Sequence, residues 1–133
     1  MKPFRTNVRD VPVEKGLRQD EGWVDMYVQF LIDEQTAGSR QLLVGRTVLP
    51  PGARHERHSH PHADDFLVVM SGNGMVYTDD GEEPAASGDV ILTPAGHFHG
   101  FNNTSEEDVL PIWGGSGTGS LDAAGYELAG EPG

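Results

Sequence analysis

Glycine and proline punctuate this chain throughout, and their spacing limits what it can fold into. The 133 residues include 18 glycines and nine prolines, which recur roughly every 8 to 12 residues along most of the chain. The runs between them are short and rich in β-branched and aromatic residues, which is typical of strands joined by tight turns. No segment has the sustained 3.6-residue apolar period of an amphipathic helix. The sequence therefore predicts an all-β chain.

Seven runs are candidate strands, and one short helix is expected around residues 121–125. The candidate strands cover residues 24–32, 42–49, 66–70, 75–78, 90–93, 98–101 and 109–113. A chain of this length supports one hydrophobic core. A single open sheet of seven strands would leave an apolar face and two edges exposed to water, so the strands are expected to close into a barrel or a sandwich.

The two ends differ from the middle in composition. Residues 1–22 hold five of the nine basic residues and do not continue the strand rhythm, so they are interpreted as an N-terminal arm. Residues 23–113 are the predicted barrel, and residues 114–133 are a glycine-rich tail that begins with GGSGTGS. That stretch is interpreted as a mobile connector, with Leu121, Tyr126 and Leu128 as the only anchors of the tail.

Charge and cysteine content exclude several classes of function. The formal net charge is −12, and no lysine or arginine follows Arg57. Nucleic acids and anionic membranes need a basic face, so neither is an expected partner. Because the chain has no cysteine, any metal must be held by nitrogen and oxygen. With no long apolar run and no apolar segment near the N-terminus, a cytoplasmic protein is expected.

The six histidines fall in two clusters. The first holds His55, His58, His60 and His62, and the second holds His97 and His99. Alternate residues of a strand share a face, so the two histidines of each His-X-His pair point the same way. Imidazoles from two neighbouring strands, with a carboxylate, would form a metal site that keeps positions open for water or substrate. The clusters alone are also compatible with a polar loop whose histidines bind nothing.

Spacing around the histidines is more specific than the clusters. In the first region the fixed positions are Gly52, His58, His60, Asp65 and Gly72, separated by five, one, four and six residues. In the second they are Gly88, Pro94, Gly96, His99 and Asn103, separated by five, one, two and three residues. The chain here resembles the cupin superfamily, whose motifs are G(X)5HXH(X)3,4E(X)6G and G(X)5PXG(X)2H(X)3N. Nine of the ten fixed positions match, and the exception is Asp65 in place of glutamate.

The resemblance implies a jelly-roll β-barrel that holds one divalent transition metal ion. Its metal ligands would be His58, His60, Asp65 and His99; iron or manganese is favoured, and zinc and nickel are the alternatives. Aspartate is one methylene shorter than glutamate, which withdraws the carboxylate by roughly 1.3 Å. Asp65 therefore either binds the metal directly or leaves a site of three histidines plus water. In a third arrangement His62, or after it Asp64, fills the fourth position.

Four other residues are candidates for proton transfer and substrate binding. His97 and His62 are the candidate catalytic residues, since an imidazole near the metal can carry a proton. Arg46 lies on a predicted strand and is the candidate anchor for a substrate carboxylate, which arginine binds bidentately. Phe101 shares a strand face with the last metal ligand and is expected to line the pocket. His55 follows a turn and is expected to be exposed.

The resemblance covers dioxygenases, isomerases, lyases and polyketide cyclases. The expected function is a metal-dependent enzyme that acts on a small chelating molecule. An oxygenase of the dioxygenase type is favoured, because three histidines with an optional carboxylate suit Fe(II) or Mn(II). A redox-neutral isomerase, lyase or cyclase is the first alternative, and a non-catalytic module that binds a metal or a small molecule is the second. Similar small cupins often lay an N-terminal arm on a partner subunit, so a homodimer is expected.

Overall fold

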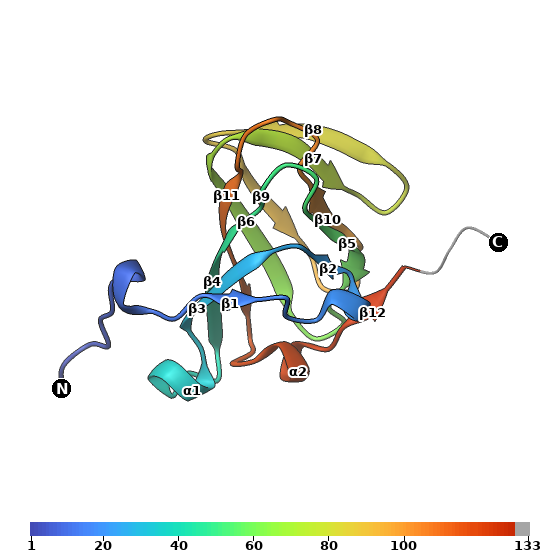
Figure 1. The fold of residues 1–133 in the computed structure, drawn as a ribbon. Coiled ribbons are helices and arrows are strands. Elements are labelled where there is room, and N and C mark those ends of the chain that lie inside the picture. Colours follow the sequence, from blue (N-terminus) through green and yellow to red (C-terminus); the bar gives the residue numbers. More distant parts are fainter. Residues whose placement is uncertain (130–133) are drawn as a thin grey trace.

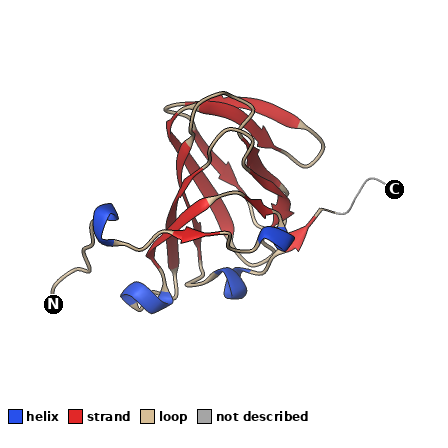
Figure 2. Ribbon diagram, in the orientation of Figure 1, coloured by secondary structure: helices blue, strands red, loops and turns tan. Residues whose placement is uncertain are grey.

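The computed structural model describes residues 1–129, and residues 130–133 of the predicted tail lie outside the described part. Strands dominate it (Figure 2) and form two antiparallel sheets (Figure 1). The first sheet contains, in spatial order, β1 (Glu14–Lys15), β3 (Tyr27–Ile32), β4 (Leu42–Val48), β11 (Leu110–Ser116), β6 (Asp64–Ser71) and β9 (Val90–Thr93). The second contains β12 (Glu127–Leu128), β5 (Arg54–Ser59), β10 (His99–Asn102), β7 (Asn73–Tyr77) and β8 (Glu82–Ala86), and β2 (Trp23–Val24) also pairs with β5. The predicted all-β architecture is confirmed.

The seven predicted runs all fall on strands, but four strands lie outside these runs: β5, β8 and the two-residue strands β1 and β12. Strand β5 reads RHERHS and contains no apolar residue, so hydrophobic alternation cannot reveal it. Strand β8 contains Pro84 and lies at the edge of its sheet, the position where a strand tolerates proline. The short helices are α1 (Glu34–Ala37), begun by an Asp33 capping box, and α2 (Leu121–Ala124), which confirms the predicted helical turn.

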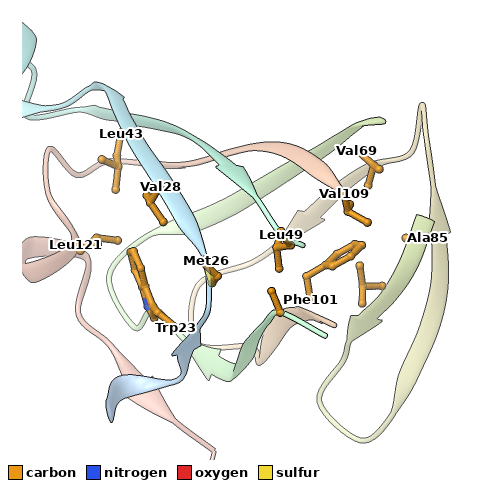
Figure 3. Packing of buried hydrophobic residues seen from close by; sticks show 12 residues of the cluster. Trp23, Met26, Val28, Leu43, Leu49, Val69, Ala85, Phe101, Val109 and Leu121 are labelled. Carbon is orange, nitrogen blue, oxygen red and sulfur yellow. The ribbon is translucent and has the colours of Figure 1, made fainter. Parts of the chain in front are cut away.

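Apolar side chains from both sheets fill the space between them. The largest fully buried ones include Trp23, Phe101, Leu49, Val28 and Val69, and Figure 3 shows them pointing into one shared layer. Each buried aliphatic or aromatic side chain contributes about 1.5–3 kcal/mol relative to exposure. This layer holds the two sheets together and fixes the positions of the strands that carry the histidines.

The glycine-rich stretch after Trp113 is not a mobile connector. Gly114 and Gly115 are buried within β11, which continues to Ser116. A Cβ added to Gly114 would lie 2.0 Å from the Leu43 carbonyl oxygen, so the close packing of β11 on β4 requires glycine here. Beyond it, α2 and β12 pack back onto the barrel, and β12 pairs with β5.

The N-terminal arm is tied to the outer face of the first sheet. The Gln29 side-chain amide donates hydrogen bonds to the carbonyls of Val8 and Val11, at 2.8 and 2.9 Å, near η1 (Val8–Asp10). A second short 3-10 turn, η2 (Gln19–Glu21), leads into β2. The first residues extend away from the barrel (Figure 1), and Met1 and Phe4 are exposed. No helix among the described residues is long and apolar enough to cross a membrane.

Candidate metal centre

Three histidines meet where β5 and β10 pair. His58 lies near the end of β5, His60 follows that strand directly, and His99 begins β10 opposite His58. Their ligand nitrogens all lie within 4.8 Å of one another. His58 and His60 are only 1% and 7% exposed. Strand pairing thus brings two residues of the first sequence cluster and one of the second into a single buried group.

Backbone carbonyls orient all three imidazoles. Nδ1 of His58 lies 2.7 Å from the Glu56 carbonyl oxygen, and Nδ1 of His60 lies 2.7 Å from that of Gly125. Nδ1 of His99 faces the His97 carbonyl oxygen at 3.4 Å. A carbonyl partner requires the proton on Nδ1, so Nε2 keeps its lone pair for a metal.

Burial keeps these imidazoles in the neutral form that metal binding requires. It lowers the pKa of His58 well below the ordinary value, lowers that of His60, and lowers the pKa of His99 to about 4. Nε2 of His99 is buried and makes no hydrogen bond to any described residue. An unpartnered buried nitrogen is costly unless another group binds it. The three nitrogens therefore fit a divalent transition metal.

Asp65, on β6, lies at the border of this group. Its Oδ2 is 3.5 Å from Nε2 of His99, and its side chain is 15% exposed. Two ligands bound at about 2.1 Å to one ion lie about 3.0–3.4 Å apart, so this separation is close to that of neighbouring ligands. Asp65 is nevertheless not one of the residues whose ligand atoms all lie within 4.8 Å of one another, which are the three histidines. Burial raises the pKa of its carboxyl well above the ordinary value.

The other two candidates for the fourth position face away from the histidines. His62 lies in the turn after Pro61 and is exposed, because the proline ends β5 before the side-chain alternation reaches it. Asp64 is exposed, and its Oδ1 accepts a hydrogen bond from the Ala95 backbone at 2.9 Å. The structure brings neither side chain to the three histidines.

His97 is likewise placed outside the centre. It lies in the connection between β9 and β10, so the strand alternation that would align it with His99 does not extend to it. Its side chain is 59% exposed, and Nδ1 pairs with Asp79 Oδ2 at 2.8 Å. The geometry gives no support for a catalytic role of His97 or of His62.

Arg46 points to the wrong side of the first sheet for a substrate anchor. Its neighbour Thr47 is buried and lines the cavity beside the histidines, so Arg46 faces the opposite way. There its guanidinium donates a hydrogen bond to Gln29 at 2.9 Å, which in turn binds the arm. The arginine therefore contributes to holding the arm and does not reach the cavity.

A cavity opens beside the three histidines. The volume open to the centres of water molecules is about 50 Å³. One water molecule needs about 10–15 Å³ on this measure, so the cavity has room for a few waters. Phe101 lines it as expected, and the other large apolar lining residues are Trp23, Met26, Leu43, Leu49, Leu67, Trp113 and Leu121. No lysine or arginine is among the described residues that line it.

His55 is the lining residue that sequence reasoning placed wrongly. Its ring stacks on His58 with centroids 3.8 Å apart, and burial lowers its pKa well below the ordinary value. The cause is a shift in the β5–β10 register: His99 pairs with His58, but Phe101 pairs with His55. The extra residue on β5 is a bulge, which turns His55 to the same side as His58. Simple alternation in the sequence cannot show it.

Sequence comparisons place the chain among the cupins. The sequence model of the cupin domain matches residues 45–113. Protein SchB of Streptomyces halstedii is 34% identical over 86 residues, which cover 65% of this chain and 62% of SchB, less than two thirds of that protein. The oxalate-binding protein of Thermotoga maritima is 27% identical over 94 residues, 71% of this chain and 76% of that protein.

Among solved structures, the polyketide cyclase RemF from Streptomyces resistomycificus has the same fold. Its TM-score is 0.78 at 18% identity, and the alignment covers 99% of this chain and 87% of RemF. With two packed antiparallel sheets in this chain, the likeness confirms the predicted jelly-roll fold.

Proposed function

The chain belongs to the cupin family, and on that premise we propose that it is a metal-dependent enzyme acting on a small organic molecule with chelating oxygens. The observation that carries the proposal is the convergence of three neutral imidazoles, one with an unpartnered Nε2, on a largely apolar cavity. A bound divalent metal would supply Lewis acidity that polarises a carbonyl or enol oxygen.

The residues around the cavity divide into two roles. His58, His60 and His99 would hold the ion through Nε2. The apolar wall, which includes Phe101 and Trp113, would pack against the carbon skeleton of the substrate. Because no lysine or arginine among residues 1–129 lines the cavity, the metal would be the cation to which the substrate's oxygens bind. This favours a compact, mostly apolar chelator over a dicarboxylate.

Proton transfer without net oxidation is the reaction that the site supports best. Asp65 is a buried carboxyl next to His99, and burial raises its pKa well above the ordinary value. A carboxyl with a raised pKa can give a proton to a substrate oxygen and take one back from carbon. Isomerisation, elimination or cyclisation of a keto-enol compound fits this role, and the fold shared with the polyketide cyclase RemF is compatible with it.

Oxygen-dependent oxidation, the dioxygenase function expected from the sequence, is the second candidate. The observation in its favour is the donor set itself, three imidazole nitrogens with a carboxylate nearby, which suits Fe(II) or Mn(II). In that reaction Asp65 would be a ligand or would position a bound water.

One set of assays separates these functions. Metal-free protein is loaded with Zn²⁺, Ni²⁺, Fe²⁺ or Mn²⁺ and given keto-enols, hydroxy acids and phenolic chelators, with and without O2. Turnover with Zn²⁺ or Ni²⁺ under anaerobic conditions supports the redox-neutral enzyme. Turnover that requires Fe²⁺ or Mn²⁺ and consumes O2 supports the oxygenase. Saturable binding without turnover would contradict both and favour a binding module.

A homodimer in the cytoplasm completes the proposal. Its support is apolar surface on the outer side of the first sheet, where Val90 and Leu92 on the edge strand β9 are 73% and 68% exposed and Met70 on β6 is 56% exposed. Exposed apolar residues on an edge strand favour contact with another chain. Light scattering would give twice the 14.4 kDa mass of the chain, and a monomeric mass would contradict the dimer.

A further inference from the structure

The C-terminal residues 117–129, here called the strap, cross the barrel beside the three histidines. They lie beyond the residues 45–113 that match the cupin domain. Strand β12 of the strap pairs with β5 so that Leu128 is opposite His58 and Glu127 opposite Ser59. The Ala129 backbone N–H donates to the Arg57 carbonyl at 2.9 Å. The strap is therefore attached directly to the strand that leads to two of the histidines.

One strap residue contacts a histidine of the centre through its backbone. The Gly125 carbonyl oxygen accepts the 2.7 Å hydrogen bond from Nδ1 of His60, 65 residues away in sequence. The corresponding carbonyls for His58 and His99 belong to residues only two positions before them. His60 is thus the one member of the group whose Nδ1 partner belongs to a distant segment.

The conformation at position 125 is restricted to glycine. Its φ is 78° and its ψ is 160°, a region that side chains of L-residues do not enter without strain. A Cβ added there would lie 2.7 Å from Cγ and 2.9 Å from Cδ of Pro61, the residue next to His60. Any other residue at position 125 must therefore move the carbonyl, the chain around His60, or both.

The rest of the strap holds this carbonyl in place. Leu121 and Ala124 are buried against the cavity. The Tyr126 ring stacks on His58 with centroids 5.0 Å apart, and its hydroxyl donates a hydrogen bond to the Glu21 carbonyl. The strap is therefore fixed on both sides of Gly125, by packing before it and by the tyrosine after it.

We propose that Gly125 is a positioning residue, whose carbonyl holds His60 with Nε2 directed at the metal position and couples order in the strap to metal binding. The inference rests on the metal binding proposed above. Partners of the non-ligating nitrogen typically change metal affinity 10- to 100-fold. Because coupling is reciprocal, bound metal must also stabilise the strap.

The test compares Gly125→Ala with Gly117→Ala. Gly117 is in the same strap with φ 73°, and a Cβ added there meets no atom within 4 Å, so this variant also places an alanine at positive φ but leaves His60 undisturbed. Competition titration with Zn²⁺ is expected to show 10- to 100-fold weaker binding for Gly125→Ala and a change below about threefold for Gly117→Ala. Equal affinities for Gly125→Ala and wild type would overturn the inference.

A second readout does not depend on metal. In the metal-free protein, ¹⁵N NMR of the imidazole is expected to show His60 protonated on Nδ1 in wild type and in Gly117→Ala, and a mixture of tautomers in Gly125→Ala. Weaker Zn²⁺ binding with an unchanged His60 tautomer would also overturn the inference. If wild type binds no Zn²⁺, the proposed function fails, and the tautomers still decide the role of Gly125.

A third measurement uses wild type alone and covers the case in which Gly125→Ala does not fold. Saturating Zn²⁺ is expected to slow amide hydrogen exchange of residues 121–129 at least threefold. Slower exchange in β5 with no change in residues 121–129 would contradict the coupling.

Discussion

The buried histidines at 58, 60 and 99 and the exposed histidines at 62 and 97 come from the same two clusters of the sequence. In each of these three buried histidines Nδ1 faces a backbone carbonyl, and the three ligand nitrogens converge. His62 lies in a turn, and His97 pairs with the exposed Asp79 on the surface. Strand ends and backbone partners, more than proximity in sequence, therefore decide which histidines can act together.

The largest effect on metal binding is expected when a histidine of the buried group is removed. His60→Ala or His99→Ala is expected to weaken Zn²⁺ binding at least about 100-fold, because loss of a ligand exceeds the effect of losing its outer partner. His62→Ala and His97→Ala, the matched controls, are expected to stay within about threefold of wild type. Metal content by mass spectrometry and chelator competition provide the measurement, and equal losses in both groups would contradict the assignment.

Bound metal is expected to raise the free energy of unfolding only when His58, His60 and His99 are all present. At a free Zn²⁺ concentration 100 times Kd, binding contributes about 2.7 kcal/mol, which raises Tm by roughly 10 °C for a domain of this size. The rise is expected to disappear in His58→Ala and to persist in His97→Ala. Calorimetry of metal-free and metal-loaded protein measures it, and a Tm rise in His58→Ala would point to a different site.

Acid should destabilise the metal-free protein through the buried histidines. Since burial lowers the pKa of His99 to about 4, the unfolded chain binds more protons than the folded one between pH 6.5 and 4. The stability from neutral His99 is fully present above about pH 6.5 and is lost as the pH falls to about 4, at most about 3 kcal/mol. Burial of His55 and His58 acts in the same direction.

Asp65 has the opposite effect on the pH dependence of stability. Because its pKa is raised in the folded protein, the folded state binds this proton more readily than the unfolded chain and gains stability as the pH falls. Asp65→Asn should therefore steepen the loss of stability toward acid, and His99→Gln should make it shallower. Urea unfolding at several pH values measures both slopes. A pH dependence that neither substitution changes would show that other groups control it.

The smallest effect on metal affinity and Tm is expected for the exposed pair of His97 and Asp79. Asp79→Asn removes the partner of His97 in a solvent-exposed pair, and such pairs contribute little to stability. The variant is expected to keep wild-type Zn²⁺ affinity and to change Tm less than any substitution among the buried histidines. A clear loss of affinity, measured by the same competition titration, would mean that the surface pair supports the centre after all.

Much of the fold and the three histidines follow from the sequence, because both rest on local rules. The motif glycines Gly52, Gly72, Gly88 and Gly96 all have positive φ, as turns at those positions require. His58, His60 and His99 stand at fixed distances from these turns, and strand pairing then brings them together.

Other parts of the site depend on features that a single sequence does not display. The bulge in β5 that turns His55 inward is a property of the pairing with β10. The sequence predicts the strand that carries Arg46, but it does not show which face of the sheet the side chain occupies. In the structure Arg46 binds Gln29 and not the cavity. The Gly125 carbonyl reaches His60 only because a tail that resembled a linker packs back onto β5.

X-ray absorption spectroscopy of the Zn²⁺-loaded wild-type protein, beside His99→Ala, tests directly whether the three histidines hold one metal ion. We expect three imidazole nitrogens at about 2.0–2.1 Å from the metal in wild type and the loss of one of them, or of the metal itself, in the variant. A wild-type spectrum without three imidazoles, or one that His99→Ala leaves unchanged, would contradict it.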